Sequence, residues 1–99
     1  MTGIYKIENT ITGEVYVGQS KNIEKRWANH RSNYKAKNKV RKYALYRDMR
    51  YYGIDKFKFE VLEECKIHEL DNKENYWIAY YAEKVHCYNI IYPEGVSRL

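Results

Sequence analysis

The sequence GIYKIENTITGEVYVG, residues 3–18, predicts a β-hairpin. Residues 3–8 and 14–18 are rich in side chains that suit a pleated, half-buried surface. Between them lies the polar segment 9–13, in which Gly13 can adopt the positive φ that a hairpin turn needs. We therefore expect two antiparallel strands here, with the remaining elements packed around them.

Two tyrosines and two glycines gather on this hairpin. Because side chains alternate between the faces of a strand, Gly3 and Tyr5 share one face, as do Tyr16 and Gly18. One interpretation is structural, since tyrosine favours strands and glycine often ends them. The other is a shallow floor of phenols beside bare backbone, where a bulky substrate can approach. On these residues alone the structural interpretation is the simpler.

The composition is that of one compact domain. The chain has 99 residues, 44% of them hydrophobic, and no apolar run approaches a membrane span or a signal-peptide core. Cys65 and Cys87 are too few for a disulfide framework, which favours a reducing compartment such as the cytoplasm. We expect the domain to span residues 1–91, with 92–99 as a tail or the start of a linker.

Basic residues concentrate in the middle of the chain. Residues 21–50 contain eleven Lys or Arg against two acids, although the whole chain carries only +5. Aromatic residues are interleaved with these bases, a combination that favours a nucleic-acid partner over a merely solvated helical face. An anionic membrane surface would require a more aliphatic amphipathic helix. The predicted DNA-binding residues are Lys21, Lys25, Arg31, Lys35, Lys39, Arg41 and Lys42.

The first predicted helix begins after a cap at Ser20 or Asn22 and ends near residue 36. Its apolar stripe contains Ile23, Trp27 and Tyr34. A second helix is expected over residues 40–52, ended by a left-handed glycine at position 53, and a half-buried strand over residues 57–62. We expect this strand to lie antiparallel beside the hairpin.

Two cationic residues of the first helix border its apolar stripe. Arg26 lies about 60° and His30 about 20° from Ile23 around the helix axis. A guanidinium beside an imidazole suits the clamping of a phosphate at the rim of a cleft. The alternatives are a surface arginine that packs through its aliphatic stem and a histidine packed in the core.

A third helix is predicted over residues 68–83, and Glu74 interrupts its apolar stripe. Leu70, Trp77 and Tyr81 define this stripe, and Glu74 falls about 40° from Leu70. A glutamate is seldom buried unless it is paired or coordinates a metal. Both a salt bridge to Arg26 and a divalent-cation ligand explain this position.

Together these features resemble the GIY-YIG nuclease family. The triplets Gly3-Ile4-Tyr5 and Tyr16-Val17-Gly18 are separated by ten residues, with Val17 in place of the usual Ile. An arginine, a histidine, a glutamate followed by Asn-Tyr-Trp, and a late asparagine then match the family pattern. The matching residues are Gly3, Tyr5, Tyr16, Gly18, Arg26, His30, Glu74 and Asn89.

The resemblance implies an α+β fold, a small three-stranded antiparallel sheet flanked by three helices in the order β-β-α-α-β-α. It also implies a DNA endonuclease, the catalytic module of a homing endonuclease, that hydrolyses phosphodiester bonds with one Mg²⁺, for which Mn²⁺ can substitute. Glu74 is then the metal ligand and Tyr5 the general base, while Arg26 neutralises charge on the phosphorus. By the same resemblance Tyr16 and His30 hydrogen-bond the phosphate or the attacking water, and Asn89 holds the geometry of the site.

Two other classes remain open at this stage. One is a non-catalytic nucleic-acid-binding module of the same fold, and the other is a protein-interaction domain with a basic surface. Family members commonly carry a separate DNA-binding domain, fused or associated, and 99 residues leave no room for one.

Overall fold

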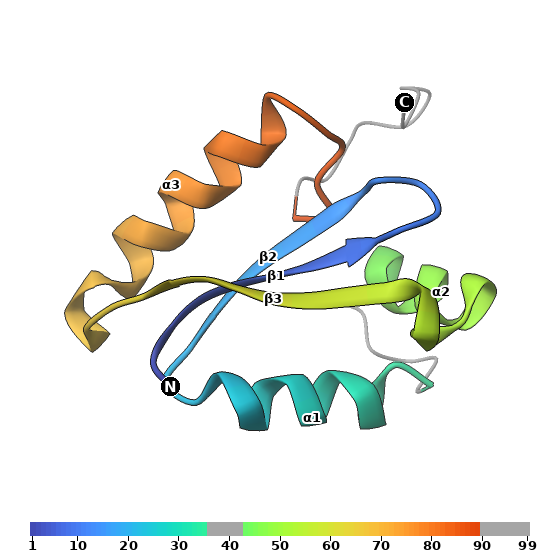
Figure 1. The fold of residues 1–99 in the computed structure, drawn as a ribbon, viewed down its shortest axis with the longest axis horizontal. Helices are drawn as coiled ribbons and strands as arrows, with labels where there is room; N and C mark the ends of the chain where they lie inside the picture. Colours follow the sequence, from blue (N-terminus) through green and yellow to red (C-terminus); the bar gives the residue numbers. More distant parts are fainter. Residues whose placement is uncertain (36–42, 90–99) are drawn as a thin grey trace.

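A computed structural model describes residues 1–35 and 43–89 of the chain. Six main elements follow one another in the predicted order β-β-α-α-β-α, which confirms the α+β fold class (Figure 1). They are β1 (Gly3–Asn9), β2 (Val15–Ser20), α1 (Ile23–Asn33), α2 (Tyr43–Tyr52), β3 (Phe57–Glu64) and α3 (Leu70–Ala82). Short 3₁₀ turns, η1 (Ile54–Lys56) and η2 (Ile67–Glu69), precede β3 and α3. The predicted DNA-binding residues Lys39, Arg41 and Lys42 and the predicted tail at 92–99 lie outside the described residues.

The hairpin forms the centre of the sheet. The strand order is β2-β1-β3, both pairings are antiparallel, and β1 lies in the middle. In the register of β1 and β2, Tyr5 lies opposite Gly18, and Ile7 lies opposite Tyr16. The turn is formed as expected, with Gly13 at φ 82°. Asn9 stabilises it, because its side-chain oxygen accepts from the backbone N–H groups of Ile11 and Thr12.

The two faces of the sheet carry separate layers. In Figure 1, α3 lies on one side of the sheet, and α1 and α2 lie on the other. Tyr5 and Ile7 of β1 pack with Leu45 and Met49 of α2, whereas Ile4 packs on the opposite face with the α3 layer. This division follows from the alternation of side chains along β1. Among the described helices, none combines the length and the apolar character that a membrane crossing requires.

Several element boundaries differ from the sequence predictions. Asn22, not Ser20, caps α1 by accepting from the Lys25 N–H at 3.0 Å, and the helix ends at Asn33, before the predicted end near residue 36. Gly53 has the predicted positive φ of 99°, but its ψ of 137° is not that of a left-handed helical cap. Strand β3 extends to Glu64. A register shift opposite Ile4 and Tyr5 interrupts the pairing of β3 beyond Val61, and Val61 itself is 40% exposed instead of half-buried.

The two glycines of the family triplets make room for other parts of the chain. A Cβ on Gly18 would lie 2.5 Å from the hydroxyl oxygen of Tyr5, because the Tyr5 ring occupies the space above Gly18. A Cβ on Gly3 would collide with the backbone carbonyl of Glu63 in β3. The prediction of a bare floor for substrate is therefore wrong: a buried phenol and a neighbouring strand fill these positions.

We predict that Gly18→Ala lowers the free energy of unfolding by about 1–3 kcal/mol, since it forces the Tyr5 ring out of its site. Urea unfolding of Gly18→Ala, Tyr5→Ala and the double variant measures this. In the Tyr5→Ala background, Gly18→Ala should lower the free energy of unfolding much less. The two substitutions should therefore show a clear coupling energy.

Gly13→Ala provides the matched control. A Cβ there meets no atom within 4 Å, and its penalty comes from the positive φ alone. The Gly13 effect should therefore add independently to that of Tyr5→Ala. Equal coupling at both glycines would contradict the steric explanation.

Candidate active site

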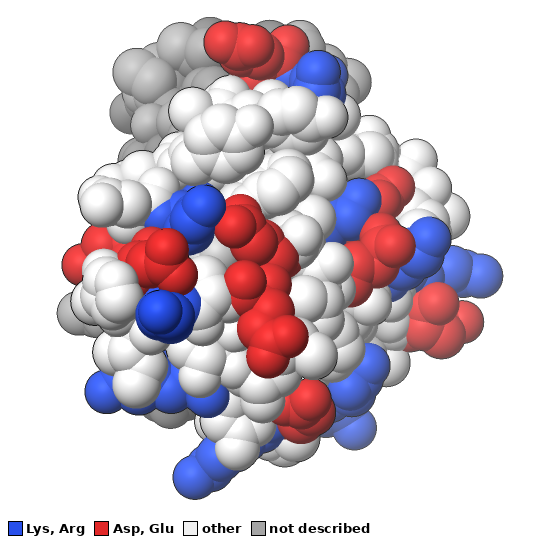
Figure 2. Space-filling view, turned by 60° about the vertical axis from the view of Figure 1, so that its left-hand side comes forward, with Lys and Arg blue, Asp and Glu red and all other residues white. Residues whose placement is uncertain are grey.

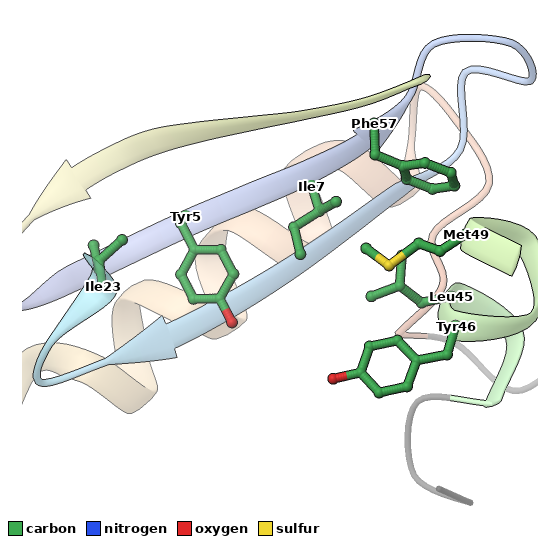
Figure 3. Close-up of a cluster of buried hydrophobic side chains, with 7 residues drawn as sticks. All are labelled: Tyr5, Ile7, Ile23, Leu45, Tyr46, Met49 and Phe57. Carbon is green, nitrogen blue, oxygen red and sulfur yellow. The ribbon is translucent and has the colours of Figure 1, made fainter. Parts of the chain in front are cut away.

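A buried imidazole lies at the centre of the site. His30 of α1 is 1% exposed, and both of its ring nitrogens are hydrogen-bonded to phenols. Its Nε2 lies 2.8 Å from the Tyr5 hydroxyl of β1, and its Nδ1 lies 2.9 Å from the Tyr46 hydroxyl of α2. Figure 3 shows the rings of Tyr5 and Tyr46 with their hydroxyl groups directed into the space between β1 and α2. His30 thus lies within the core, which agrees with the alternative of a packed core histidine and not with a position at the rim of a cleft.

Tyr16 of β2 completes a set of three phenols around this imidazole. The Tyr16 ring centroid lies 5.8 Å from that of His30 and 6.4 Å from that of Tyr5. The sequence prediction included Tyr5, Tyr16 and His30 but missed Tyr46. A signal was present, because Tyr46 lies about 60° from Met49 and so borders the apolar face of α2.

All three phenols are harder to ionise than a free tyrosine. Burial raises the pKa of Tyr5 well above its ordinary value, and it raises the pKa of Tyr16 to about 12. Burial also raises the pKa of Tyr46. The charge of Arg26 opposes the shift at each of these phenols. At neutral pH the phenols are therefore uncharged hydrogen-bonding groups.

Arg26 is an exposed cation at the edge of this phenol cluster. Its charge acts on Tyr5, Tyr16 and Tyr46, which places the guanidinium near all three rings. Within the described residues it forms no ion pair, so the alternative of a salt bridge to Glu74 is not realised.

Glu74 of α3 reaches the same site from the other face of the sheet. Its negative charge raises the pKa of both Tyr5 and Tyr16. Its carboxylate is half-buried and accepts from the Gln19 side-chain amide at 3.4 Å, while Asp71, one turn earlier, accepts from the same nitrogen at 2.8 Å. Sequence reasoning identified neither Gln19 nor Asp71. Asp71 lies one turn from Glu74 on the same helix, but only the tertiary fold brings Gln19 beside them.

The donor set fits a hard divalent cation that keeps most of its water. Glu74 offers carboxylate oxygens, the ligands that Mg²⁺ prefers, and Mg²⁺ is usually held by one or two carboxylates plus water and substrate phosphate. Within residues 1–35 and 43–89 there is no group of three or more His, Cys, Asp or Glu side chains that could enclose a metal. A site of one protein carboxylate is consistent with both facts.

Asn89 braces the strand that carries Tyr16 and Gly18. Its side-chain oxygen accepts from the Val17 N–H at 2.8 Å, and its amide donates to the Val17 carbonyl at 2.7 Å. Because β2 is an edge strand, these backbone groups would otherwise have no strand partner. Asn89 thus positions β2, and the role in the geometry of the site that the resemblance implies for it stays a prediction.

The basic side chains of α1 and those of β3 and α3 have different surroundings. Lys6, Lys58 and Lys73 are paired with glutamates of β1 and β3. On the face seen in Figure 2, a row of acidic side chains lies among separate basic ones. The exposed bases around α1, in contrast, form no ion pair with any residue that the structure describes; they are Lys21, Lys25, Arg31 and Lys35. Arg31 additionally stacks on the Phe59 ring at 4.2 Å.

The fold and this constellation define a GIY-YIG catalytic domain, and the model of that family matches residues 1–89. The chain therefore belongs to the GIY-YIG family.

Its similarity to particular proteins extends over most of the chain. It is 35% identical over 91 residues to intron-associated endonuclease 1 of Enterobacteria phage T4, covering 90% of this chain but 36% of that protein. Its fold matches the catalytic domain of homing endonuclease I-TevI with a TM-score of 0.76 and 31% identity, covering 93% of this chain and 100% of that one. A glutamate-to-alanine mutant of the catalytic domain of intron endonuclease I-TevI matches with a TM-score of 0.75 and 32% identity, covering 91% of this chain and 93% of that one.

The raised pKa of Tyr16 predicts an alkaline loss of stability. Above pH 10 the unfolded chain releases this proton while the folded chain retains it up to about pH 12, so the free energy of unfolding falls as the pH rises through this window. Tyr16→Phe removes this titration. From about pH 9 to about pH 11 the variant should lose less free energy of unfolding than the wild type, as measured by urea unfolding.

Tyr51→Phe is the control, because Tyr51 is 79% exposed. This variant should follow the wild-type pH dependence. A Tyr16→Phe curve parallel to that of the wild type would show that the Tyr16 phenol ionises normally in the folded protein.

Proposed function

We propose that the chain is the catalytic module of a DNA endonuclease that hydrolyses phosphodiester bonds with a divalent cation. One observation carries the proposal: two strands and two helices bring Tyr5, Tyr16, His30, Arg26 and Glu74 to one site. The site combines a cation for the phosphate, a carboxylate for a metal and a buried hydrogen-bonded base. Membership of the GIY-YIG family and similarity to phage endonucleases support the same activity.

Glu74 is the residue that would hold the cation, with water and substrate phosphate supplying the other ligands. When bound there, Mg²⁺ or Mn²⁺ polarises a phosphoryl oxygen and favours departure of the leaving oxygen. In the absence of a cation, the Gln19 amide donates a hydrogen bond to the Glu74 carboxylate and holds it in place. The second carboxylate, that of Asp71, adds negative charge that attracts a cation to this edge of the sheet.

The Tyr5–His30 pair would accept the proton of the attacking water. A free phenolate at Tyr5 is disfavoured, because burial raises the pKa of this phenol. When the water proton moves to the Tyr5 oxygen, the original Tyr5 proton can pass to His30 Nε2 at 2.8 Å. The products are a hydroxide that attacks phosphorus and an imidazolium at His30, so no phenolate forms. His30 then acts through Tyr5 and does not itself contact the phosphate.

Arg26 and Tyr16 would bind the phosphate. The exposed guanidinium forms no ion pair with a described residue, and its charge can offset the negative charge that develops on the phosphoryl oxygens. The uncharged Tyr16 phenol can donate a hydrogen bond to one of these oxygens.

DNA would approach across α1. Exposed bases along this helix neutralise backbone phosphates, whereas the bases of β3 and α3 are already paired with glutamates. The chain spans about a third of the length of the curated relative that it matches, 36%. We propose that a DNA-binding domain, fused or separate, supplies sequence recognition, and that the protein acts in the cytoplasm, where its free thiols would stay reduced.

Cleavage of supercoiled plasmid, with and without Mg²⁺, tests this proposal. We predict that Arg26→Ala lowers the cleavage rate at least about a hundredfold, because the phosphate loses its main electrostatic partner. DNA affinity, measured by filter binding, should change little, since several other bases share the contact. Arg31→Ala is the matched control on the same helix and should keep most of the activity. Equal rates for both variants would overturn the role of Arg26, and a wild type that binds but never cuts would indicate a non-catalytic binding module.

We also predict that Glu74→Gln abolishes metal-dependent cleavage without unfolding the protein. Among the described residues Glu74 hydrogen-bonds to the Gln19 amide alone, so its replacement by an isosteric amide leaves no buried charge without a partner. Thermal melts with and without excess Mn²⁺ provide the measurement. The metal should raise the Tm of the wild type and leave that of Glu74→Gln unchanged.

Glu83→Gln, an exposed carboxylate beyond the end of α3, should respond to Mn²⁺ like the wild type. If the Tm of Glu74→Gln rises with Mn²⁺ as much as that of the wild type, Glu74 is not the metal ligand.

A further inference from the structure

The hydroxyl of Tyr46 is a buried contact of the site to which the proposed reaction assigns no role. It lies 2.9 Å from His30 Nδ1, on the side of the imidazole opposite Tyr5. Tyr5, His30 and Tyr46 therefore form one continuous hydrogen-bonded chain that links β1, α1 and α2. The ring of Tyr46 belongs to the apolar cluster drawn in Figure 3, but its oxygen is hydrogen-bonded to the imidazole of His30.

A neutral imidazole has one N–H and one bare nitrogen, so the two phenols cannot play the same part. Tyr5 is 1% exposed, and among the described residues its hydroxyl has no hydrogen-bond partner other than His30 Nε2. An O–H buried without an acceptor is costly, so Tyr5 donates to a bare Nε2. The proton of the imidazole then lies on Nδ1, which donates to the Tyr46 oxygen. Tyr46 is 5% exposed against 1% for Tyr5, so its side chain is the less completely enclosed of the two.

We propose that Tyr46 is a positioning residue for the hydrolysis: by accepting the Nδ1–H of His30, it fixes the tautomer whose bare Nε2 can take the proton of Tyr5. This inference rests on the proposed function, because it concerns the same proton transfer. Without Tyr46, the imidazole can carry its proton on Nε2, where it cannot accept from Tyr5. The Tyr46 oxygen also stabilises the imidazolium that the transfer creates, since a hydrogen bond from a charged donor is stronger than a neutral one.

The surroundings of His30 make this support important. The titratable and charged groups around the ring include Tyr5 of β1, Tyr16 of β2, Tyr46 of α2 and Arg26 of its own helix. Both ring nitrogens are hydrogen-bonded to phenols, which are uncharged at neutral pH. In the described part of the chain, the phenol oxygen of Tyr46 is the hydrogen-bond acceptor for the Nδ1 proton.

Tyr46→Phe tests the proposal, because it removes only the hydroxyl and keeps the ring in the core. Tyr52→Phe is the matched control: Tyr52 lies on the same helix and packs against the same cluster, and its hydroxyl has no hydrogen bond to any described residue. Nitrogen-15 NMR of the imidazole reports the tautomer and the pKa of His30 without any need for cleavage. Plasmid nicking with Mg²⁺ then gives kcat and KM as a function of pH.

In the wild type and in Tyr52→Phe, we expect the proton on Nδ1 and a bare Nε2. In Tyr46→Phe, the Nε2–H form should become populated and the His30 pKa should fall. The kcat of this variant should drop about ten- to hundredfold with little change in KM, which corresponds to one hydrogen bond to a charged donor.

Three results would overturn the inference. The first is an unchanged tautomer in Tyr46→Phe, and the second is a wild-type imidazole protonated on Nε2. The third is an altered tautomer with an unaltered kcat, which would make Tyr46 a structural residue only. If the wild type bound DNA but did not cut it, the proposed function would fail on its own, while the NMR result would still decide whether Tyr46 sets the tautomer.

Discussion

The packing of the Tyr5 ring over Gly18 is the contact on which the rest of the site depends. A side chain at position 18 would lie within 2.5 Å of the phenol oxygen, so only glycine permits this arrangement. The ring fixes the register of the hairpin, and its hydroxyl reaches His30 Nε2 at 2.8 Å, which ties α1 to the sheet. His30 in turn contacts Tyr46 and so connects α2. One close approach of ring to backbone thus aligns three elements around the imidazole.

β2 lies at the edge of the sheet, and this position lets residues from other parts of the chain contact it. The sheet separates α3 from α1 and α2, yet the carboxylate of Glu74 influences phenols on the opposite face. Gln19, near the end of this edge strand, donates a hydrogen bond to the Glu74 carboxylate. Asn89 occupies the free edge of the same strand through both backbone groups of Val17. The edge strand that carries Tyr16 is therefore braced by Asn89.

Burial and charge act in opposite directions on the phenols, and burial is the larger effect. It raises the pKa of Tyr5 and Tyr16 despite the nearby Arg26. The site is consequently built from neutral hydrogen-bonding groups around an imidazole, with its cation and its carboxylate at the periphery. In such a site, proton transfer between neighbours is easier than the formation of an isolated phenolate.

The sequence determined the elements and most of the site, because local patterns carry that information. Alternation predicted the hairpin, helical periodicity predicted the three helices, and the spacing of the two triplets with Arg26, His30, Glu74 and Asn89 identified the family. Tertiary structure alone decided that His30 is buried between two phenols, that Gly18 accommodates Tyr5, and that Gln19 and Tyr46 belong to the site. The physical reason is that these contacts join residues from 13 to 55 positions apart, across strands and layers whose relative placement no local pattern encodes.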